Sequence, residues 1–338
     1  MRAWRAISYG NPVDCLRLQL LKKPVPGPGD VRLRVQSASL NPIDFKLLHG
    51  DLRGVQQLDF PATLGFDACG IVDALGAAAS RFQLGDRVFV RASRSTLGAF
   101  AEFCVQPERF VALAPANTDS SGAASLPLVA LTTVQGLVDR AEAKAGQRIL
   151  IHAGSGGLGS FAIQYAHQLG LRVETTTSSR NIDWVRALGA DRVIAYDRED
   201  YRRSGAIYDI VFDALGGAHT LDAFAVIKPG GCVVSVAGPP DRQMAAKFAG
   251  NLLIRGLMNF SARKIYSAAR AKRATYFRFL TESDGAQLAQ VAALVERGAI
   301  KPVVDRVFRF EDCVAAMEYL IAGHARGKVV LDVAGSQS

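Results

Sequence analysis

The sequence predicts an α/β protein in which a doubly wound parallel sheet is inserted in a mostly antiparallel, barrel-like domain. Three observations lead to this prediction. The first third of the chain holds short apolar or alternating runs separated by turn residues. From Arg148 onward, short apolar runs alternate with helical stretches. The end of the chain returns to the style of the first third, so we expect it to fold back onto the first domain.

The first third is predicted to be β-structure. Gly, Pro, Asp and Asn punctuate its runs, as in Lys23–Asp30, and mark turns between strands. Parallel βα units need longer helical spacers than most of these connections provide, so antiparallel pairing is favoured. The predicted strands are Arg2–Ile7, Leu16–Leu21, Val31–Leu40, Cys69–Leu75, Arg87–Arg91 and Phe100–Val105.

The pattern changes near Ser120. The Ala- and Leu-rich segment Ala123–Ala143 predicts one or two helices. Strands are then predicted at Arg148–His152, Leu171–Thr176, Arg192–Ala195, Tyr208–Phe212, Gly231–Val236 and Thr275–Leu280. Helices are predicted between them at Leu158–Leu169, Ile182–Leu188, Ala218–Ile227 and Asp241–Leu253. This alternation is typical of a parallel sheet with right-handed crossovers.

The tail is predicted to contain the helix Gln287–Arg297, the strand Val303–Phe308, the helix Asp312–Ala322 and the strand Lys328–Val333. These patterns place the domain boundaries near residues 122 and 282. The first domain would then comprise residues 1–122 and 283–338, and residues 123–282 would form the inserted domain.

Composition limits the possible classes. The 338 residues are 49% hydrophobic and 21% charged, which is typical of a globular protein with two cores. No apolar run reaches the roughly 20 residues of a membrane span, and no secretory signal is evident, so we expect a cytoplasmic protein. The five scattered cysteines include no pair at CxxC spacing, which indicates free thiols.

The net charge of +9 leaves two interpretations open. A basic excess helps to hold an anionic ligand or a nucleic acid, or it belongs to an ordinary solvated surface. Much of it lies in Arg255–Arg273, where tyrosines are interleaved. We favour an exposed basic helix there and expect no nucleic-acid partner.

The strongest local motif is the segment Ile149–Ser160, in which an apolar strand runs into a glycine turn that opens an apolar helix. Gly154, Gly156 and Gly159 satisfy GxGxxG. Backbone without Cβ atoms can approach a pyrophosphate, and the helix N-terminus offers free N–H groups and a positive dipole. In this strand–turn–helix setting the motif predicts dinucleotide binding.

The end of the second strand favours NADP over NAD. Glu174 has the spacing of an NAD-type acidic residue, but we expect it to lie within the strand rather than at its tip. The tip itself carries Ser178, Ser179 and Arg180. Hydroxyl donors and a guanidinium suit a 2′-phosphate. The alternative for Arg180 is an ordinary surface arginine that opens the next helix.

Several further segments, taken in order, carry a resemblance. In the first domain they are Ser39–Lys46, Leu64–Gly70, Phe82–Val88 and Gly98–Glu102; beyond it they are Leu126–Thr133, the glycine turn, Ala187–Asp191 and Gly323–Val330. Together they resemble the medium-chain dehydrogenase/reductase superfamily over essentially the whole chain, and its zinc-free quinone oxidoreductase branch in particular. The resemblance implies a Rossmann domain inserted in a GroES-like catalytic domain.

The resemblance also implies chemistry without zinc. Zinc-dependent relatives hold the metal through Cys, His and Glu or Cys, whereas the matching positions here are Asn41 and Gly65-Phe66-Asp67. A phenylalanine side chain cannot ligate zinc. We therefore expect hydride transfer from NADP(H) directly to an electrophilic acceptor, either a quinone or an α,β-unsaturated carbonyl such as an enone or alkenal.

By this resemblance Asn41, Asp44 and Lys46 face the nicotinamide from the mouth of a cleft. Lys46 would supply positive charge or a proton to the acceptor oxygen, and Asn41 would bind the substrate carbonyl or the nicotinamide ribose. Asp44 either caps a helix or touches ligand. Many quinone reductases carry tyrosine where Lys46 stands, and lysine there is more similar to the enone reductases.

The resemblance assigns further residues to the cofactor. The expected contacts are Thr132 near the nicotinamide, Gly154, Ser155, Gly156, Gly157, Leu158 and Gly159 at the pyrophosphate, Ser178, Ser179, Arg180 and Tyr196 at the 2′-phosphate, Leu215, Gly216, Ala237 and Gly238 at the fourth and fifth strand ends, and Lys328 at the ribose or nicotinamide. A homodimer is expected because dimers are common in the superfamily. The alternative function is a non-catalytic NADPH-binding protein of the crystallin type that senses redox state or binds RNA.

Overall fold

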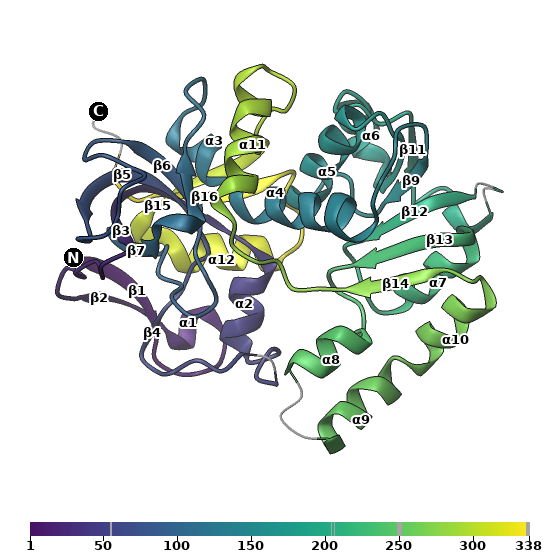
Figure 1. The fold of residues 1–338 in the computed structure, drawn as a ribbon, viewed down its shortest axis with the longest axis horizontal. Helices are drawn as coiled ribbons and strands as arrows, with labels where there is room; N and C mark the ends of the chain where they lie inside the picture. The colour runs from purple at the N-terminus through teal and green to yellow at the C-terminus, as the bar shows by residue number, and fades with distance from the viewer. Residues whose placement is uncertain (55, 204, 206, 249–251, 336–338) are drawn as a thin grey trace. The chain divides into compact units, whose positions relative to one another are not determined.

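A computed structural model describes residues 1–54, 56–203, 205, 207–248 and 252–335 (Figure 1). The chain divides into two compact units: unit 1 comprises Met1–Leu131 and Glu282–Ser338, and unit 2 comprises Thr132–Thr281. The first break falls later than the predicted boundary near residue 122. One reason is that helix α3 (Ser120–Ala124) packs against the strands of unit 1.

Unit 1 is built on two sheets in which antiparallel pairing prevails. The larger, seven-stranded sheet has the order β15-β16-β3-β5-β6-β8, with β7 paired to β3, and the smaller, three-stranded sheet has the order β2-β1-β4. Among the described pairs of unit 1, β15–β16 is the parallel one. The strands are β1 (Arg2–Ala6), β2 (Leu16–Leu20), β3 (Asp30–Leu40), β4 (Ala62–Thr63), β5 (Asp67–Leu75), β6 (Arg87–Arg91), β7 (Phe103–Pro107), β8 (Val111–Leu113), β15 (Val304–Arg309) and β16 (Lys328–Asp332).

Strand β3 joins the two chain segments of unit 1. Its residues Val31, Leu33 and Val35 alternate into the core, as expected for a strand with one buried face. Strand β16 pairs antiparallel with its second half, so the tail lies inside the larger sheet. The helices of this part are α1 (Pro12–Cys15), α2 (Pro42–His49), α3, α4 (Pro127–Val134), α11 (Gly285–Glu296) and α12 (Cys313–Ile321), and α4 crosses the break between the units.

Unit 2 contains a six-stranded parallel sheet of order β11-β10-β9-β12-β13-β14. The chain enters at β9, moves outward to β11, and then returns to β12 to move outward on the other side. The strand order therefore reverses between β9 and β12, where ligands bind in sheets of this type. The strands are β9 (Arg148–Ile151), β10 (Arg172–Thr177), β11 (Arg192–Ala195), β12 (Tyr208–Asp213), β13 (Ile227–Ser235) and β14 (Thr275–Arg278).

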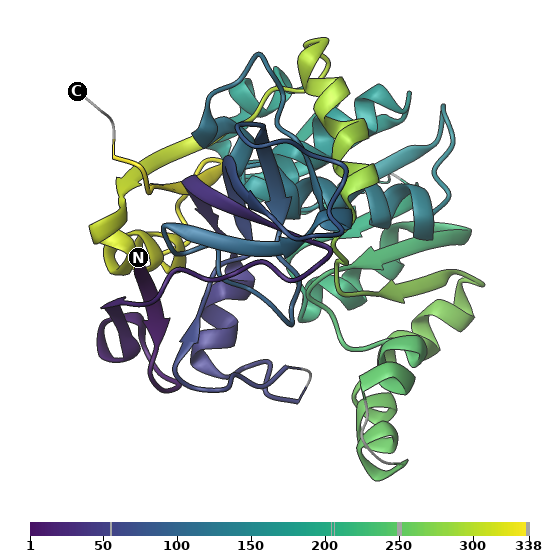
Figure 2. The same ribbon diagram turned by 60° about the vertical axis from the view of Figure 1, so that its left-hand side comes forward.

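Helices connect these strands. They are α5 (Gly157–Gln168), α6 (Ile182–Arg186), α7 (Ala218–Val226), α8 (Arg242–Phe248), α9 (Leu252–Ser261) and α10 (Arg263–Ala271). The predicted helix Asp241–Leu253 includes residues 249–251, which lie outside the described part of the chain. The basic stretch Arg255–Arg273 lies largely on α9 and α10. Helix α10 packs against α7 and β14, and α9 continues away from the sheet of unit 2 (Figures 1 and 2).

The predicted fold class is confirmed: a doubly wound parallel sheet interrupts a mostly antiparallel domain. The sequence prediction missed β4 and β8, which have two and three residues and are too short to show an alternating pattern. Within the described residues we find no helix with the length and apolar character that a bilayer crossing requires.

Candidate functional site

In unit 1, five polar or charged residues meet at one end of the larger sheet. Asn41 follows the last residue of β3, Asp67 and Lys328 begin β5 and β16, and Arg91 ends β6. The antiparallel register places Ser39 opposite Asp67, and Asp67 opposite Arg91, so these residues lie together. With Asp44 of α2 they form what we call the buried polar cluster: Asn41, Asp44, Asp67, Arg91 and Lys328.

The Asn41 amide is held at both ends. Its Nδ2 donates to Asp67 Oδ2 at 2.8 Å, and Lys328 Nζ donates to its Oδ1 at 2.7 Å. A second, longer Nδ2 contact reaches the carbonyl of Ser39 at 3.4 Å. Since both Nδ2 hydrogens have acceptors, the remaining capacity of this amide is a lone pair on Oδ1.

Asp67 and Lys328 form a buried pair. Asp67 is 0% and Lys328 5% exposed, and Lys328 Nζ lies 3.6 Å from Asp67 Oδ2. Burial raises the pKa of Asp67 and lowers the pKa of Lys328, while the attraction between them opposes both shifts. Ser39 Oγ and the backbone N–H of Leu128 also donate to Asp67, so the carboxylate is well satisfied.

Asp44 caps helix α2. Its Oδ2 accepts from the backbone N–H of Asn41 at 2.8 Å, three residues earlier in the chain. Its Oδ1 is buried and has no hydrogen-bond partner among the described residues. Burial raises the pKa of Asp44 to about 8, because little in its surroundings stabilises the charge on this oxygen.

Arg91 is the remaining member of the buried polar cluster. The residue is 2% exposed, and its guanidinium lies 4.9 Å from the ring centroid of Phe66 and donates to Ser283 Oγ. Burial lowers the pKa of Arg91 to about 10, so the side chain is still charged at neutral pH. The phenylalanine at position 66 therefore packs against a cation in the core of unit 1.

Lys46 is different from these residues. It lies one turn further along α2 than Asn41 and is half-buried. We find no hydrogen bond or ion pair of its ammonium group with any described residue. The structure thus does not join Lys46 to the buried polar cluster and leaves its amine without a protein partner in the described chain.

In unit 2, the glycine turn is anchored to the neighbouring strand. The backbone N–H of Ala153 donates to Thr176 Oγ1, and that of Gly154 donates to the carbonyl of Thr176. Ala153 has φ of +55°, a left-handed conformation that a non-glycine residue adopts at a cost. The turn is therefore held firmly in a strained shape before helix α5 begins.

Two glycines of the motif differ in the space that a side chain would have at their positions. A Cβ on Gly159 would lie 2.2 Å from the carbonyl oxygen of Ala153, so only glycine allows the helix to pass this close to the turn. A Cβ on Gly156 would meet only that same oxygen, at 3.4 Å, and would otherwise point into open space. Gly156 is the N-cap residue of α5, a helix of 12 residues, and has no side chain that could accept from the first N–H groups of the helix. Those N–H groups are therefore available to a pyrophosphate.

The residues predicted for the 2′-phosphate lie at the tips of β10 and β11. Ser178, Ser179 and Arg180 follow β10, and Tyr196 follows β11, with 65% of its surface exposed. Asp197 joins them: its Oδ1 accepts from the backbone N–H of Ser179 at 2.9 Å, and its Oδ2 from Ser179 Oγ at 2.6 Å. We call these five residues the strand-tip group.

Glu174, the acidic residue with NAD-type spacing, lies elsewhere. Its carboxylate is 2.6 Å from Arg148, 3.7 Å from Arg192 and 2.8 Å from the Tyr208 hydroxyl. Those three partners begin β9, β11 and β12, at the opposite edge of the parallel sheet from the strand-tip group. The carboxylate of Glu174 is therefore bound by residues of unit 2 at the amino ends of the strands.

Sequence reasoning missed Asp213, a fully buried carboxylate at the end of β12. Its Oδ1 accepts from the backbone N–H groups of Leu215 and Gly216, both at 3.0 Å, and lies 3.2 Å from His152 Nδ1. Burial opposes ionisation, but the hydrogen bonds it accepts, that from His152 foremost, hold the pKa of Asp213 well below its usual value.

Asp213 also reaches the fifth strand end. Its Oδ2 accepts from Ser235 Oγ at 2.8 Å, and Ser235 Oγ in turn accepts from the backbone N–H of Gly238 at 2.7 Å and of Ala237 at 3.3 Å. One carboxylate therefore ties together the chain before the glycine turn and the two turns predicted to line the cofactor. The signal for it was present, since Asp213 is a charged residue that ends an apolar strand and precedes two glycines.

The other predicted residue of unit 2 is Thr132. It is buried on α4, and its hydroxyl lies 2.7 Å from that of Thr281; these two threonines are the first and the last residue of unit 2.

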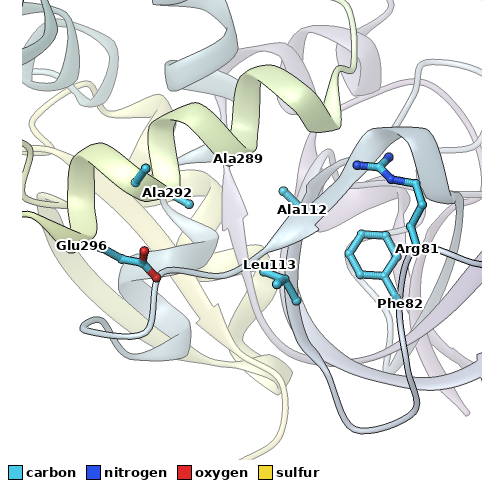
Figure 3. A pocket seen from close by; sticks show the side chains of 8 residues that line it. Arg81, Phe82, Ala112, Leu113, Ala289, Ala292 and Glu296 are labelled. Atoms are coloured by element: carbon cyan, nitrogen blue, oxygen red, sulfur yellow. The ribbon is translucent and has the colours of Figure 1, made fainter.

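Within unit 1 a separate pocket of about 350 Å³ lies between α11 and β8 (Figure 3). The residues that line it include Arg81, Ala112, Leu113, Ala292 and Glu296, and none of its lining residues is a predicted site residue.

Comparison with known proteins agrees with this architecture. Residues 27–116 match the family model described as the alcohol dehydrogenase GroES-like domain, and residues 188–331 match the one described as zinc-binding dehydrogenase. Among the described residues, however, no three His, Cys, Asp or Glu side chains gather to hold a metal. Asp67 is paired with Lys328 and Phe66 packs against Arg91, so these residues do not fit zinc and we derive no step through it.

Whole-chain relatives point the same way. The NADPH-dependent alkenal/one oxidoreductase of Arabidopsis thaliana chloroplasts is 34% identical over 98% of this chain and 79% of its own. A chloroplastic quinone-oxidoreductase homolog of Spinacia oleracea is 30% identical over 98% of both chains. The solved quinone oxidoreductase of Coxiella burnetii superposes with a TM-score of 0.84 at 30% identity, over 98% of this chain and 99% of that one.

Proposed function

Since the chain belongs to the quinone oxidoreductase-like branch of the medium-chain dehydrogenase/reductase superfamily, we propose that it is an NADPH-dependent reductase of quinones or α,β-unsaturated carbonyls. The observation that carries this proposal is the strained glycine turn followed by the uncapped N-terminus of α5. Its free N–H groups suit a pyrophosphate, and the strand-tip group carries donors that suit a 2′-phosphate.

NADPH, when bound, supplies a hydride. Gly156 and the first turn of α5 hold the pyrophosphate, while the turns at Leu215–Gly216 and Ala237–Gly238 line the cofactor, with Asp213 fixing both turns. The buried polar cluster fixes Asn41 so that only Oδ1 can engage a ligand. An acceptor oxygen suits a donor, so we assign Asn41 to a ribose hydroxyl rather than to a substrate carbonyl.

Lys46 is the residue that we propose to contact the substrate that accepts the hydride. Hydride addition places negative charge on the oxygen of a quinone or enone, and a nearby cation stabilises that charge. Its amine has no protein partner in the described chain, so it is free to approach the acceptor. Lys46 also supplies the proton that completes the reduction, either directly or through water. Asp44 supports this segment by capping α2.

A panel assay tests the proposal. Oxidation of NADPH is followed with quinones, alkenals and bulkier enones as acceptors, and binding is followed by quenching of Trp184 fluorescence, a residue of α6. We expect turnover, with enones and alkenals served at least as well as quinones because position 46 is lysine. NADPH binding without turnover of any acceptor would favour the non-catalytic alternative instead.

Two further parts of the proposal concern the protein's setting. We propose a homodimer in the cytoplasm, although the Arabidopsis relative is named as chloroplastic. Sedimentation of the purified protein tests the dimer, and fractionation of the source cells tests the location. We propose no nucleic-acid partner for the basic helices α9 and α10.

A further inference from the structure

The donors of Ser179 already hold an anion that belongs to the chain itself. Asp197 accepts from both the backbone N–H and the hydroxyl of Ser179, at 2.9 and 2.6 Å. These hydrogen bonds lower the pKa of Asp197, so the carboxylate is ionised at neutral pH. A carboxylate accepts here from one N–H and one O–H, and these are donors that two oxygens of a phosphate can also use.

The surroundings of this pair are open and otherwise cationic. Asp197, Arg180 and Tyr196 are all exposed. We find no hydrogen bond or ion pair of the Arg180 guanidinium with any described residue. Because Asp197 is exposed, its side chain can turn into solvent when another anion takes the Ser179 donors. Such an exchange leaves Arg180 and Ser179 facing the incoming anion.

We propose that Asp197 is a specificity-determining residue that competes with the 2′-phosphate of NADPH for the two donors of Ser179. The inference rests on the proposed function, because it takes the strand-tip group as the site of the adenosine ribose. NADPH binding requires Asp197 to leave Ser179, and the remaining negative charge repels the phosphate. NADH brings no phosphate and leaves the contact intact. The wild-type protein therefore discriminates between the two cofactors less than Ser179 and Arg180 alone would allow.

The experiment measures binding of nucleotide fragments, which requires no acceptor. Affinities for 2′,5′-ADP and 5′-ADP are determined by calorimetry at one fixed ionic strength for the wild type, Asp197→Asn and Asp197→Ala. Glu199→Gln is the matched control. It removes the same charge two residues away, where Glu199 pairs with Arg192 and does not contact Ser179.

We expect Asp197→Asn and Asp197→Ala to bind 2′,5′-ADP about five- to twenty-fold more tightly, with 5′-ADP changed less than about two-fold. Glu199→Gln should change the 2′,5′-ADP affinity by less than about two-fold, since exposed charges are screened. In a Ser179→Ala background the gain from Asp197→Asn should shrink, because the donors in dispute are reduced to one.

Four results would overturn the inference. Weaker 2′,5′-ADP binding by Asp197→Asn would mean that Asp197 orients Ser179 for the phosphate. Weaker 5′-ADP binding would mean that Asp197 holds a ribose hydroxyl. Equal gains in Asp197→Asn and Glu199→Gln would reduce the effect to general charge. If no form binds 2′,5′-ADP, the strand-tip site is wrong, and NADPH turnover in the panel assay decides separately whether the chain is a reductase.

Discussion

In unit 1, Asp44, Asp67, Arg91 and Lys328 are almost completely buried, and most of their polar atoms bond to other protein groups. In unit 2, Arg180, Tyr196 and Asp197 are exposed at the strand tips. The buried polar cluster is closed to solvent, and the charges of Asp67 and Lys328 stabilise each other, whereas Asp44 Oδ1 has no partner among the described residues. The strand-tip group is open, so its donors can exchange one anion for another. Changes in the first should therefore alter stability, and changes in the second should alter ligand affinity.

The largest effect should come from breaking the buried pair. Asp67→Ala leaves Lys328 buried without its counter-charge, and we expect a loss of about 3–5 kcal/mol in the free energy of unfolding. Denaturant titration measures it. Lys46→Ala changes a residue outside the buried polar cluster and should alter the free energy of unfolding by less than about 0.5 kcal/mol. A loss below about 1 kcal/mol for Asp67→Ala would show that the pair is not closed.

Substitutions at two positions of the glycine turn should separate an effect on stability from an effect on NADPH affinity. Gly159→Ala forces Cβ against the Ala153 carbonyl, so we expect about 2 kcal/mol of lost stability and loss of NADPH affinity. Gly156→Ala has room for Cβ, so stability should change by less than about 1 kcal/mol while NADPH affinity falls about ten-fold. Thermal unfolding and NADPH titration measure both quantities. Unchanged NADPH binding by Gly156→Ala would remove the pyrophosphate from this turn.

Asp44 should make the stability of unit 1 depend on pH. Its folded pKa of about 8 lies above the unfolded value of 3.8, so the folded state binds the proton more tightly. This stabilisation is complete below about pH 4 and is lost as the pH rises through about 8. Relative to Asp44→Asn, the wild type should lose roughly 2 kcal/mol between about pH 6 and about pH 8. Parallel stability curves for the two proteins would contradict a buried, protonated Asp44.

Substitution of Lys46 tests whether this side chain, which lies outside the buried polar cluster, takes part in turnover. Lys46→Ala should lower kcat/KM about thirty-fold, because the acceptor oxygen loses a cation, while the dissociation constant of NADPH stays within about two-fold. Lys46→Arg keeps the charge and should recover part of the rate. Steady-state kinetics with the best acceptor of the panel measure both variants. Unchanged turnover would leave Lys46 as a surface residue.

The smallest expected effect is on cofactor choice. Arg180→Ala should weaken NADPH binding about ten-fold and NADH binding less than about two-fold, because only NADPH carries the 2′-phosphate. Competitive titration with both cofactors measures the ratio. An equal fall for NADPH and NADH would show that Arg180 does not face the phosphate.

The local features were predictable because each depends on residues close in the chain. The alternation of Val31, Leu33 and Val35 predicts a strand, and the spacing of Gly154, Gly156 and Gly159 predicts a tight turn before a helix, without reference to any distant residue. Placing Glu174 inside its strand was possible for the same reason, since its neighbours are extended on both sides. The roles assigned to the individual site residues stay predictions until they are measured.

The partners of those residues were not predictable. Asn41 and Asp67 are far apart in sequence, and Lys328 is further still, yet strand register brings all three into hydrogen-bonding distance. Asp197 faces Ser179 because β10 and β11 run parallel and end side by side. Periodicity and glycine spacing are local, so they were sufficient to predict the fold class and the glycine turn. Which charged side chains are buried in pairs and which face solvent depends on which strand ends meet, and the folded chain alone shows this.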